Sequence, residues 1–113
     1  MGGKASKRKG ASGEREVATI LTDLTGYTTR RKLGAARDGG NDIDFMDWCI
    51  EVKRTERVSL PKFWKQAKRQ TTANKKAAVV LRWSGEEWLI VTSLKDWIET
   101  NRENFVIYAN TDE

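Results

Sequence analysis

The stretch that decides the fold runs from residue 42 to residue 53 and reads DIDFMDWCIEVK. Polar and apolar residues alternate along both of its halves, which predicts two short strands joined in a tight hairpin. A two-residue turn at positions 46–47 places Asp42 opposite Glu51, whereas a turn one residue later places Asp44 opposite Glu51. The sequence therefore predicts the hairpin and leaves its register open.

The residues before the hairpin predict one helix, one short strand and a loop. Between Ser12, a suitable N-cap, and Gly26, which can end a helix, apolar residues recur at helical spacing. Residues 27–31 are short and β-prone, and residues 32–41 carry three glycines without periodicity. A helix over 12–26, a strand over 27–31 and a mobile loop over 32–41 are expected.

A basic helix is predicted after the hairpin, with Ser59 as its cap and Pro61 in its first turn. Apolar and basic positions separate on this helix as on an amphipathic surface helix. The apolar stripe consists of Leu60, Phe63, Trp64 and Ala67, and the basic positions are Lys62, Lys65, Lys68 and Arg69.

The last third of the chain predicts a second hairpin and a final helix. Residues 77–83 and 87–92 are strand-like and are separated by a turn at 84–86. Ser93 and Asp96 can cap a helix that ends near residue 100, and residues 105–109 could add an edge strand. The order of elements predicts an α/β fold in which helices flank a mixed central β-sheet.

Length and composition limit the protein to one small domain. A chain of 113 residues has room for one modest core, so residues 11–113 are expected to form a single domain and residues 1–10 a disordered basic arm. There is no secretory signal pattern, no apolar run of about 20 residues and only one cysteine. A cytoplasmic location, in a bacterial, archaeal or phage-infected cell, is expected.

Charge is distributed unevenly along the chain. The net charge of +5 divides into +4 over residues 1–10, −3 over 11–52, +8 over 53–76 and −4 over 77–113. An acidic stretch thus runs directly into a strongly basic one. This pattern suits an enzyme that binds a divalent metal at carboxylates and holds a polyanion beside them, although a solvated lysine-rich helix would give the same pattern.

The acidic hairpin carries residue types suited to phosphodiester hydrolysis. Carboxylates bind hard divalent metals, which activate water and neutralise charge on a phosphate. Asp42 or Asp44 could act together with Glu51, and Lys53 shares a strand face with Glu51 because the two are two residues apart. An acid and a lysine at this spacing also occur by chance, so the weight comes from the neighbouring acidic strand and the basic segment that follows.

These residues resemble a known superfamily. Asp42 followed nine residues later by Glu51-Val52-Lys53 resembles the signature of PD-(D/E)XK nucleases, with Asn41 where a proline often stands. Residues 9–17 are similar to the start of archaeal Holliday-junction resolvases. Further segments look like small phage-encoded nucleases of the superfamily, namely 39–43, 50–54, 66–69 and 79–80.

The resemblance implies a restriction-endonuclease-like core and a set of site residues. It assigns Glu14, Asp42 and Glu51 to metal binding, together with the Val52 carbonyl, and Lys53 to catalysis, with Asp44 as the alternative aspartate. Mg²⁺ is the implied metal, and Mn²⁺ could replace it. The implied activity is that of a DNA endonuclease, most typically a homodimeric Holliday-junction resolvase acting in DNA recombination.

Candidate DNA contacts come from the glycine loop and the basic segment. They are Arg30, Arg31, Lys32, Arg37, Arg54, Lys62, Lys65, Gln66 and Arg69, and Gln66 could also support the site. Trp64 could stack on a base, but its helical spacing with Leu60 and Phe63 favours the core, and the other four tryptophans are assigned to packing. The absence of histidine excludes His-ligated zinc. Two alternatives stay open: a nuclease for linear or nicked duplex, and a nucleic-acid-binding protein without catalysis.

Overall fold

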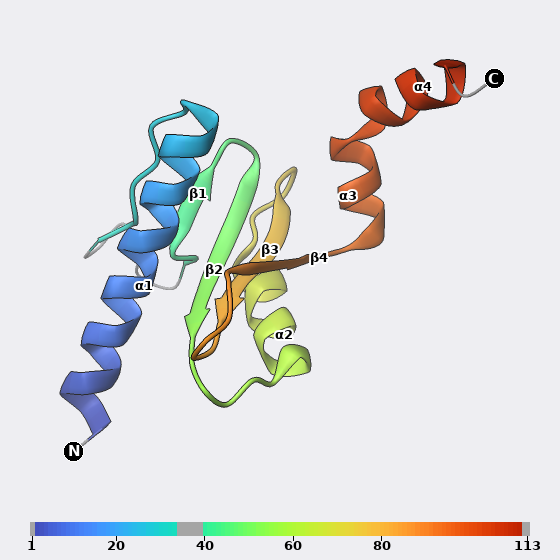
Figure 1. Ribbon diagram of the computed structural model, residues 1–113. Coiled ribbons are helices and arrows are strands. Elements are labelled where there is room, and N and C mark those ends of the chain that lie inside the picture. The colour runs from blue at the N-terminus through green and yellow to red at the C-terminus, as the bar shows by residue number, and fades with distance from the viewer. Residues whose placement is uncertain (1, 34–39, 112–113) are drawn as a thin grey trace.

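The computed structural model describes residues 2–33 and 40–111, with side chains from residue 10 onward within these ranges. Figure 1 shows a twisted sheet with a helix on either side and two further helices beyond its edge. The elements are α1 (Gly2–Thr25), β1 (Ile43–Phe45), β2 (Trp48–Arg54), α2 (Leu60–Gln70), β3 (Lys76–Arg82), β4 (Leu89–Thr92), α3 (Leu94–Thr100) and α4 (Arg102–Thr111). The predicted α/β fold, with helices flanking a mixed sheet and consistent with a restriction-endonuclease-like core, is confirmed.

The sheet order is β1-β2-β3-β4, with β2 and β3 parallel and the outer pairs antiparallel. In the first hairpin Phe45 pairs with Trp48, so residues 46 and 47 form the turn. Extending the ladder by one step places Asp42 opposite Glu51. The structure therefore adopts the first of the two registers that the sequence allowed.

Each face of the sheet packs on one helix. On one face, Val17 and Ala18 of α1 pack with Ile43, Ile50, Val52, Ala78 and Val80. On the other, Phe63 and Ala67 of α2 pack with Ala77, Val79 and Leu81. Because Glu51 and Lys53 pair in parallel with Val79 and Leu81, both side chains lie on the α2 face. The core thus fixes the direction in which the two charged residues of β2 point.

Three predicted elements differ from the structure. Residues 2–10, expected to be a disordered arm, are helical, so α1 begins at Gly2 and not at Ser12. Lysine, arginine and alanine residues in this segment favour a helix. Residues 27–31 form no strand, and only Arg31 makes an isolated bridge to Ile43. The edge strand expected at 105–109 is wrong, because these residues belong to α4.

The other predicted ends agree well with the structure. Gly26 adopts a φ of 77° directly after α1, as a helix-ending glycine does. Ser93 accepts a hydrogen bond from the Asp96 amide and caps α3, whereas Ser59 occupies the N-cap of α2 without a capping bond from its side chain. Most of the loop expected over 32–41 lies outside the described residues, and the division into an arm and a domain stays a prediction.

After β4 the chain leaves the body. The helices α3 and α4 extend past the sheet edge (Figure 1) and bury no residue, and the molecule measures 60 × 32 × 29 Å. Among the described residues, none of the helices combines the length and apolar character needed to cross a bilayer.

Candidate active site

A polar pocket of about 550 Å³ lies where α1, the first hairpin and α2 approach one another. The four side chains that the sequence singled out for metal binding or catalysis line it together, namely Glu14, Asp42, Glu51 and Lys53. The remaining lining residues are Gly10, Val52, Arg54, Thr55, Arg57, Phe63 and Gln66. Residues from distant parts of the sequence therefore share one cavity.

The three carboxylates of this pocket are almost fully buried. Glu14 is 3% exposed, Asp42 2% and Glu51 4%. Taking a carboxylate out of water is unfavourable unless other groups stabilise its charge. The groups around each carboxylate must therefore stabilise its charge.

Asp42 is held by the backbone of both neighbouring segments. Its Oδ2 accepts a hydrogen bond from the Val52 amide at 2.8 Å, its carbonyl accepts one from the Lys32 amide at 2.8 Å, and its own amide donates to the Ile50 carbonyl at 3.0 Å. These bonds fix the side chain beside β2. The aspartate is therefore positioned by the hairpin register.

Asp44, the alternative aspartate, lies outside the lining of this pocket. Its carboxylate accepts a hydrogen bond from Asn41 Nδ2 at 3.0 Å and lies 3.6 Å from Lys32 Nζ, and the side chain is 45% exposed. Partial burial acts to raise the pKa of Asp44, but the Asn41 hydrogen bond and the Lys32 charge outweigh it and lower the pKa. The two aspartates thus occupy different environments.

Glu51 and Lys53 form a contact across the α2 face of β2. Lys53 Nζ lies 3.3 Å from Glu51 Oε2, and Gln66 Nε2 of α2 donates to the same oxygen at 3.0 Å. Lys53 Nζ also lies 5.3 Å from the centre of the Phe63 ring. Gln66, predicted to contact DNA or support the site, is therefore placed against Glu51, and Lys53 is held between a carboxylate and an aromatic face.

Glu14 reaches the pocket from α1. Its Oε1 lies 3.4 Å from Arg31 Nη1. The preceding residue, Gly13, allows α1 to lie close to the sheet, because an added Cβ would come within 3.3 Å of Arg54 Cβ and of the Trp88 ring. Glu14 thus enters the pocket next to a close approach of helix and sheet.

The donor set suits a hard divalent cation. Carboxylate oxygens are the ligands that such ions prefer, and three of them line one polar pocket. Over residues 2–33 and 40–111, no three or more Asp, Glu, Cys or His side chains are grouped as closely as a ready metal site requires. In this structure Arg31 lies against Glu14, and Lys53 and Gln66 against Glu51.

The predicted DNA contacts occupy several places. Lys62, Lys65 and Arg69 are exposed on α2, Arg30 is exposed beyond α1, and Arg54 lines the pocket. Arg31 contacts Glu14, and Lys32 contacts Asn41 and Asp44. Arg37 lies outside the described residues.

Sequence reasoning missed two features of the site. Arg57 lines the pocket, and its place within the basic segment 53–76 could have identified it. Asn41, which directly precedes Asp42 in the sequence, is buried, and its Nδ2 donates a hydrogen bond to Asp44 Oδ1. Its substitution for the usual proline was the available signal.

The tryptophans follow the packing assignment, one of them outside the core clusters. Trp48, Trp64, Trp83 and Trp88 pack against the two core clusters. Trp97 is 49% exposed. Within the described residues, its one ring contact is with Phe105 of the following helix. Trp97 therefore packs outside the two core clusters, on a neighbouring helix.

Comparison with known families matches residues 5–112 to a family described as "phage putative PDDEXK endonuclease". The match covers nearly the whole chain, including the pocket, most of α1 and all of α4. No curated protein and no solved structure matches significantly.

Proposed function

Because the chain belongs to this phage PDDEXK endonuclease family, we propose that it is a Mg²⁺-dependent endonuclease that hydrolyses phosphodiester bonds of DNA. The observation that carries the proposal is the convergence of Glu14, Asp42, Glu51 and Lys53 on one pocket. Mn²⁺ is expected to replace Mg²⁺, because it also accepts oxygen ligands.

Glu14, Asp42 and Glu51 would hold the metal, with the Val52 carbonyl as a further oxygen ligand. A bound divalent ion supplies an activated water and neutralises charge that develops on the phosphate. The chain supplies the rigidity. The Val52 amide fixes one oxygen of Asp42, and Gln66 orients Glu51 through its Oε2. These bonds hold the ligand oxygens before substrate arrives.

We assign to Lys53 the role of acting on the phosphate itself. Its ammonium lies 3.3 Å from Glu51 Oε2 and faces the same pocket. A cation at this position can donate a hydrogen bond to a phosphate oxygen and stabilise the charge that develops on it. Replacing Lys53 with Ala removes that donor and leaves the carboxylates in place.

DNA would approach over the basic residues around the pocket. Arg54 and Arg57 line it, and Lys62, Lys65 and Arg69 are exposed on α2. Such side chains bind phosphates without reading sequence, which suits an enzyme that recognises shape. We place a four-way junction first among substrates, because residues 9–17, which include Glu14, resemble the start of junction resolvases. Symmetric cleavage of a junction needs two active sites and therefore two copies of the chain.

A matched pair of variants tests the site. Asp42→Asn keeps the volume of the side chain and an acceptor for the Val52 amide but removes the charge, so cleavage of a labelled junction with Mg²⁺ should fall by at least about 100-fold. Asp44→Asn makes the same change outside the pocket and should stay within about threefold of the wild-type rate. Equal loss in both variants, or full activity in Asp42→Asn, would show that the site is misassigned.

Substrate and chemistry are separated by a second comparison. Cleavage rates on a four-way junction, a flap, a nicked duplex and a linear duplex should rank the junction first. A higher rate on linear or nicked duplex would keep the nuclease and change its substrate. Binding without cleavage of any of these DNAs, in Mg²⁺ and in Mn²⁺, would favour a protein that only binds nucleic acid.

A further inference from the structure

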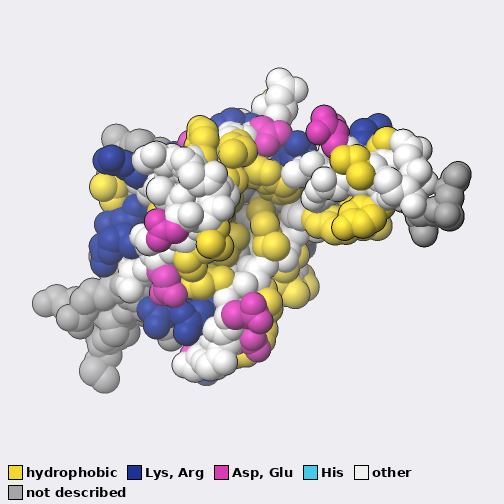
Figure 2. All heavy atoms as spheres, turned by 45° about the horizontal axis from the view of Figure 1, so that its top comes forward, with side chains coloured by type: hydrophobic (Ala, Val, Ile, Leu, Met, Phe, Trp, Pro, Cys, Tyr) yellow, Lys and Arg dark blue, Asp and Glu magenta, His cyan; other side chains and the backbone are white. Residues whose placement is uncertain are grey.

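The C-terminal arm, defined as α3 and α4, exposes a large apolar surface. Neither helix buries a residue. Figure 2 shows hydrophobic side chains gathered along one side of this projecting segment and again on the body of the molecule. The exposed apolar residues of the arm are Leu94, Trp97, Ile98, Phe105, Val106, Ile107 and Tyr108.

The helix α4 has no polar face over its centre. Residues 105–108 are four consecutive large apolar side chains, so they point in all directions around the helix, and all four are exposed. A helix that is apolar all round is normally covered on several sides. The ring contact of Trp97 with Phe105, at 5.2 Å between centroids, joins α3 to α4 and covers only a small part of this surface.

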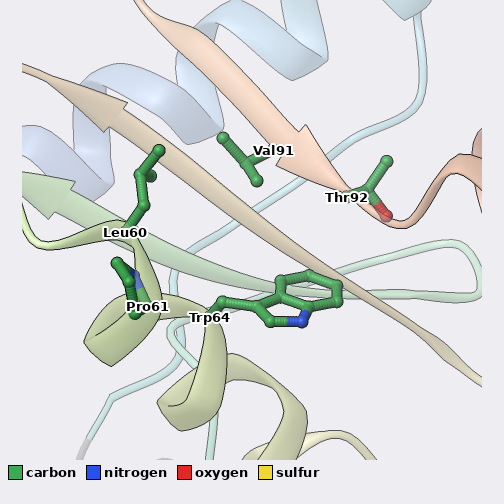
Figure 3. A pocket seen from close by; sticks show the side chains of 5 residues that line it. All are labelled: Leu60, Pro61, Trp64, Val91 and Thr92. Atoms are coloured by element: carbon green, nitrogen blue, oxygen red, sulfur yellow. The ribbon is translucent and has the colours of Figure 1, made fainter.

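An apolar groove lies on the body near the base of the arm. It is lined by Leu60, Pro61, Trp64, Val91 and Thr92, and we call it the β4 groove. In Figure 3 the first turn of α2 forms one wall and β4 forms the other, with the Trp64 ring lying across the floor. Because β4 is the last strand of the sheet, this groove opens at an edge that no further strand of the described chain covers.

We propose that the C-terminal arm of each copy packs on the β4 groove of a second copy, in a symmetric dimer. The charges of the two surfaces are complementary. The arm helices carry three acidic and two basic residues, whereas Lys68 of α2, which is not among the proposed DNA contacts, lies at the groove with its Nζ 5.9 Å from the centre of the Trp64 ring. Reciprocal packing would cover both apolar surfaces in one closed assembly.

The exposed area is sufficient for a stable dimer. At roughly 100 Å² for each large, half-exposed apolar side chain, complete burial of the seven residues on each of two arms would remove on the order of 1,400 Å² from water, an upper limit before the grooves are counted, against about 1,600 Å² in total for a standard interface. Two other occupants fit less well. DNA is not attracted to arm helices whose net charge is −1, and interfacial membrane helices carry mainly lysine and arginine on their polar face.

The dimer deepens the proposed function, because a junction nuclease needs two active sites. Only the biological purpose of the dimer rests on the proposed function. The test of the dimer measures mass and not cleavage. Failure of dimerisation and failure of cleavage can therefore be told apart.

The experiment measures the mass of the full chain by light scattering and sedimentation equilibrium, across a micromolar to hundred-micromolar series. The wild type should approach twice the 12.9 kDa of one chain. Val106→Glu and Tyr108→Glu place a charge on the apolar arm and should raise the dissociation constant at least about 30-fold. Asn104→Glu, on an exposed polar position of the same helix, is the matched control and should leave it unchanged.

The groove is tested from its own side. Leu60→Glu adds a carboxylate at the N-terminus of α2, where a negative charge favours the helix, and it should weaken the dimer. Mixing Leu60→Glu with Val106→Glu restores one undamaged arm and groove pair, so the mixture should associate more tightly than either variant alone.

Several results would overturn the proposal. A monomeric wild type over the whole series would mean that the arm folds back or meets a different partner. A dimer that resists both arm variants, with circular dichroism showing both folded, would place the interface elsewhere. Mixing without gain would exclude the pairing of arm with groove.

Discussion

Replacing Gly13 with Ala tests the close approach between α1 and the sheet. The added methyl carbon would lie 3.3 Å from Arg54 Cβ and 3.3 Å from the Trp88 ring. Favourable contacts between carbon atoms lie at about 3.5–4.0 Å, so one of the neighbours must move by a few tenths of an ångström. Both contacts belong to the region that carries Glu14 into the pocket.

Two opposing effects decide the sign. Alanine is favoured over glycine inside a helix by about 1 kcal/mol. Overpacking a tight contact costs about 1–3 kcal/mol. Gly13→Ala should therefore lower the free energy of unfolding by up to about 2 kcal/mol, or leave it unchanged where the neighbours yield easily. Gly10→Ala is the control, because a Cβ at Gly10 meets no atom within 4 Å and the full helix gain should appear.

Urea unfolding followed by tryptophan fluorescence measures both variants. Gly10→Ala should raise the midpoint, and the two variants should differ by about 1–3 kcal/mol in the free energy of unfolding. Gly13→Ala should also lower the cleavage rate under conditions in which the variant is still fully folded, because a shift of α1 moves Glu14. Equal stabilisation by both substitutions would refute the close packing of α1 on β2.

Two further substitutions test contacts outside the site. Glu16 Oε1 accepts hydrogen bonds from Arg82 Nη1 and Trp88 Nε1, each at 2.9 Å. Glu16→Gln should therefore lower the free energy of unfolding by about 1 kcal/mol. No change in a urea titration would show that these bonds contribute nothing. The hydrogen bond from Lys76 Nζ, at 2.6 Å, lowers the pKa of Asp47 below its ordinary value of 3.8, so this carboxylate stabilises the fold above that pH and loses its contribution as the pH falls through the lowered pKa. Asp47→Asn should therefore be less stable than wild type near neutral pH, by well under about 1 kcal/mol because the pair is exposed. That gap should close in acid, and a gap that widens below the ordinary pKa would contradict the assignment.

The hairpin illustrates what the sequence could and could not predict. Alternation identified both strands, but the two candidate registers differ by two residues in pairing, so they place the same side chains on the same faces. Only the turn distinguishes them. The turn uses Met46 at a φ of 54°, a conformation that glycine or asparagine would have signalled and methionine does not.

The wrong edge strand has a similar cause. Residues 105–109 are rich in aromatic and β-branched side chains, which favour strands. A strand also needs a partner, however, and α3 has already carried the chain away from β4, the edge that could have offered one. Asn101 ends α3 with its amide bonded to the last turn, and Phe105 then donates to the Asn101 carbonyl, so the chain starts a new helix.

The energetics of the pocket argue that function, and not stability, maintains its composition. Glu14, Asp42 and Glu51 are each less than 5% exposed. Arg31 and Lys53 lie against two of them, and a backbone amide bonds the third. Even well-paired buried charges rarely stabilise a fold more than apolar residues of the same size would. A chain with one modest core gains little from three buried carboxylates in one pocket, whereas a site that must gather hard oxygen ligands beside a lysine needs them there.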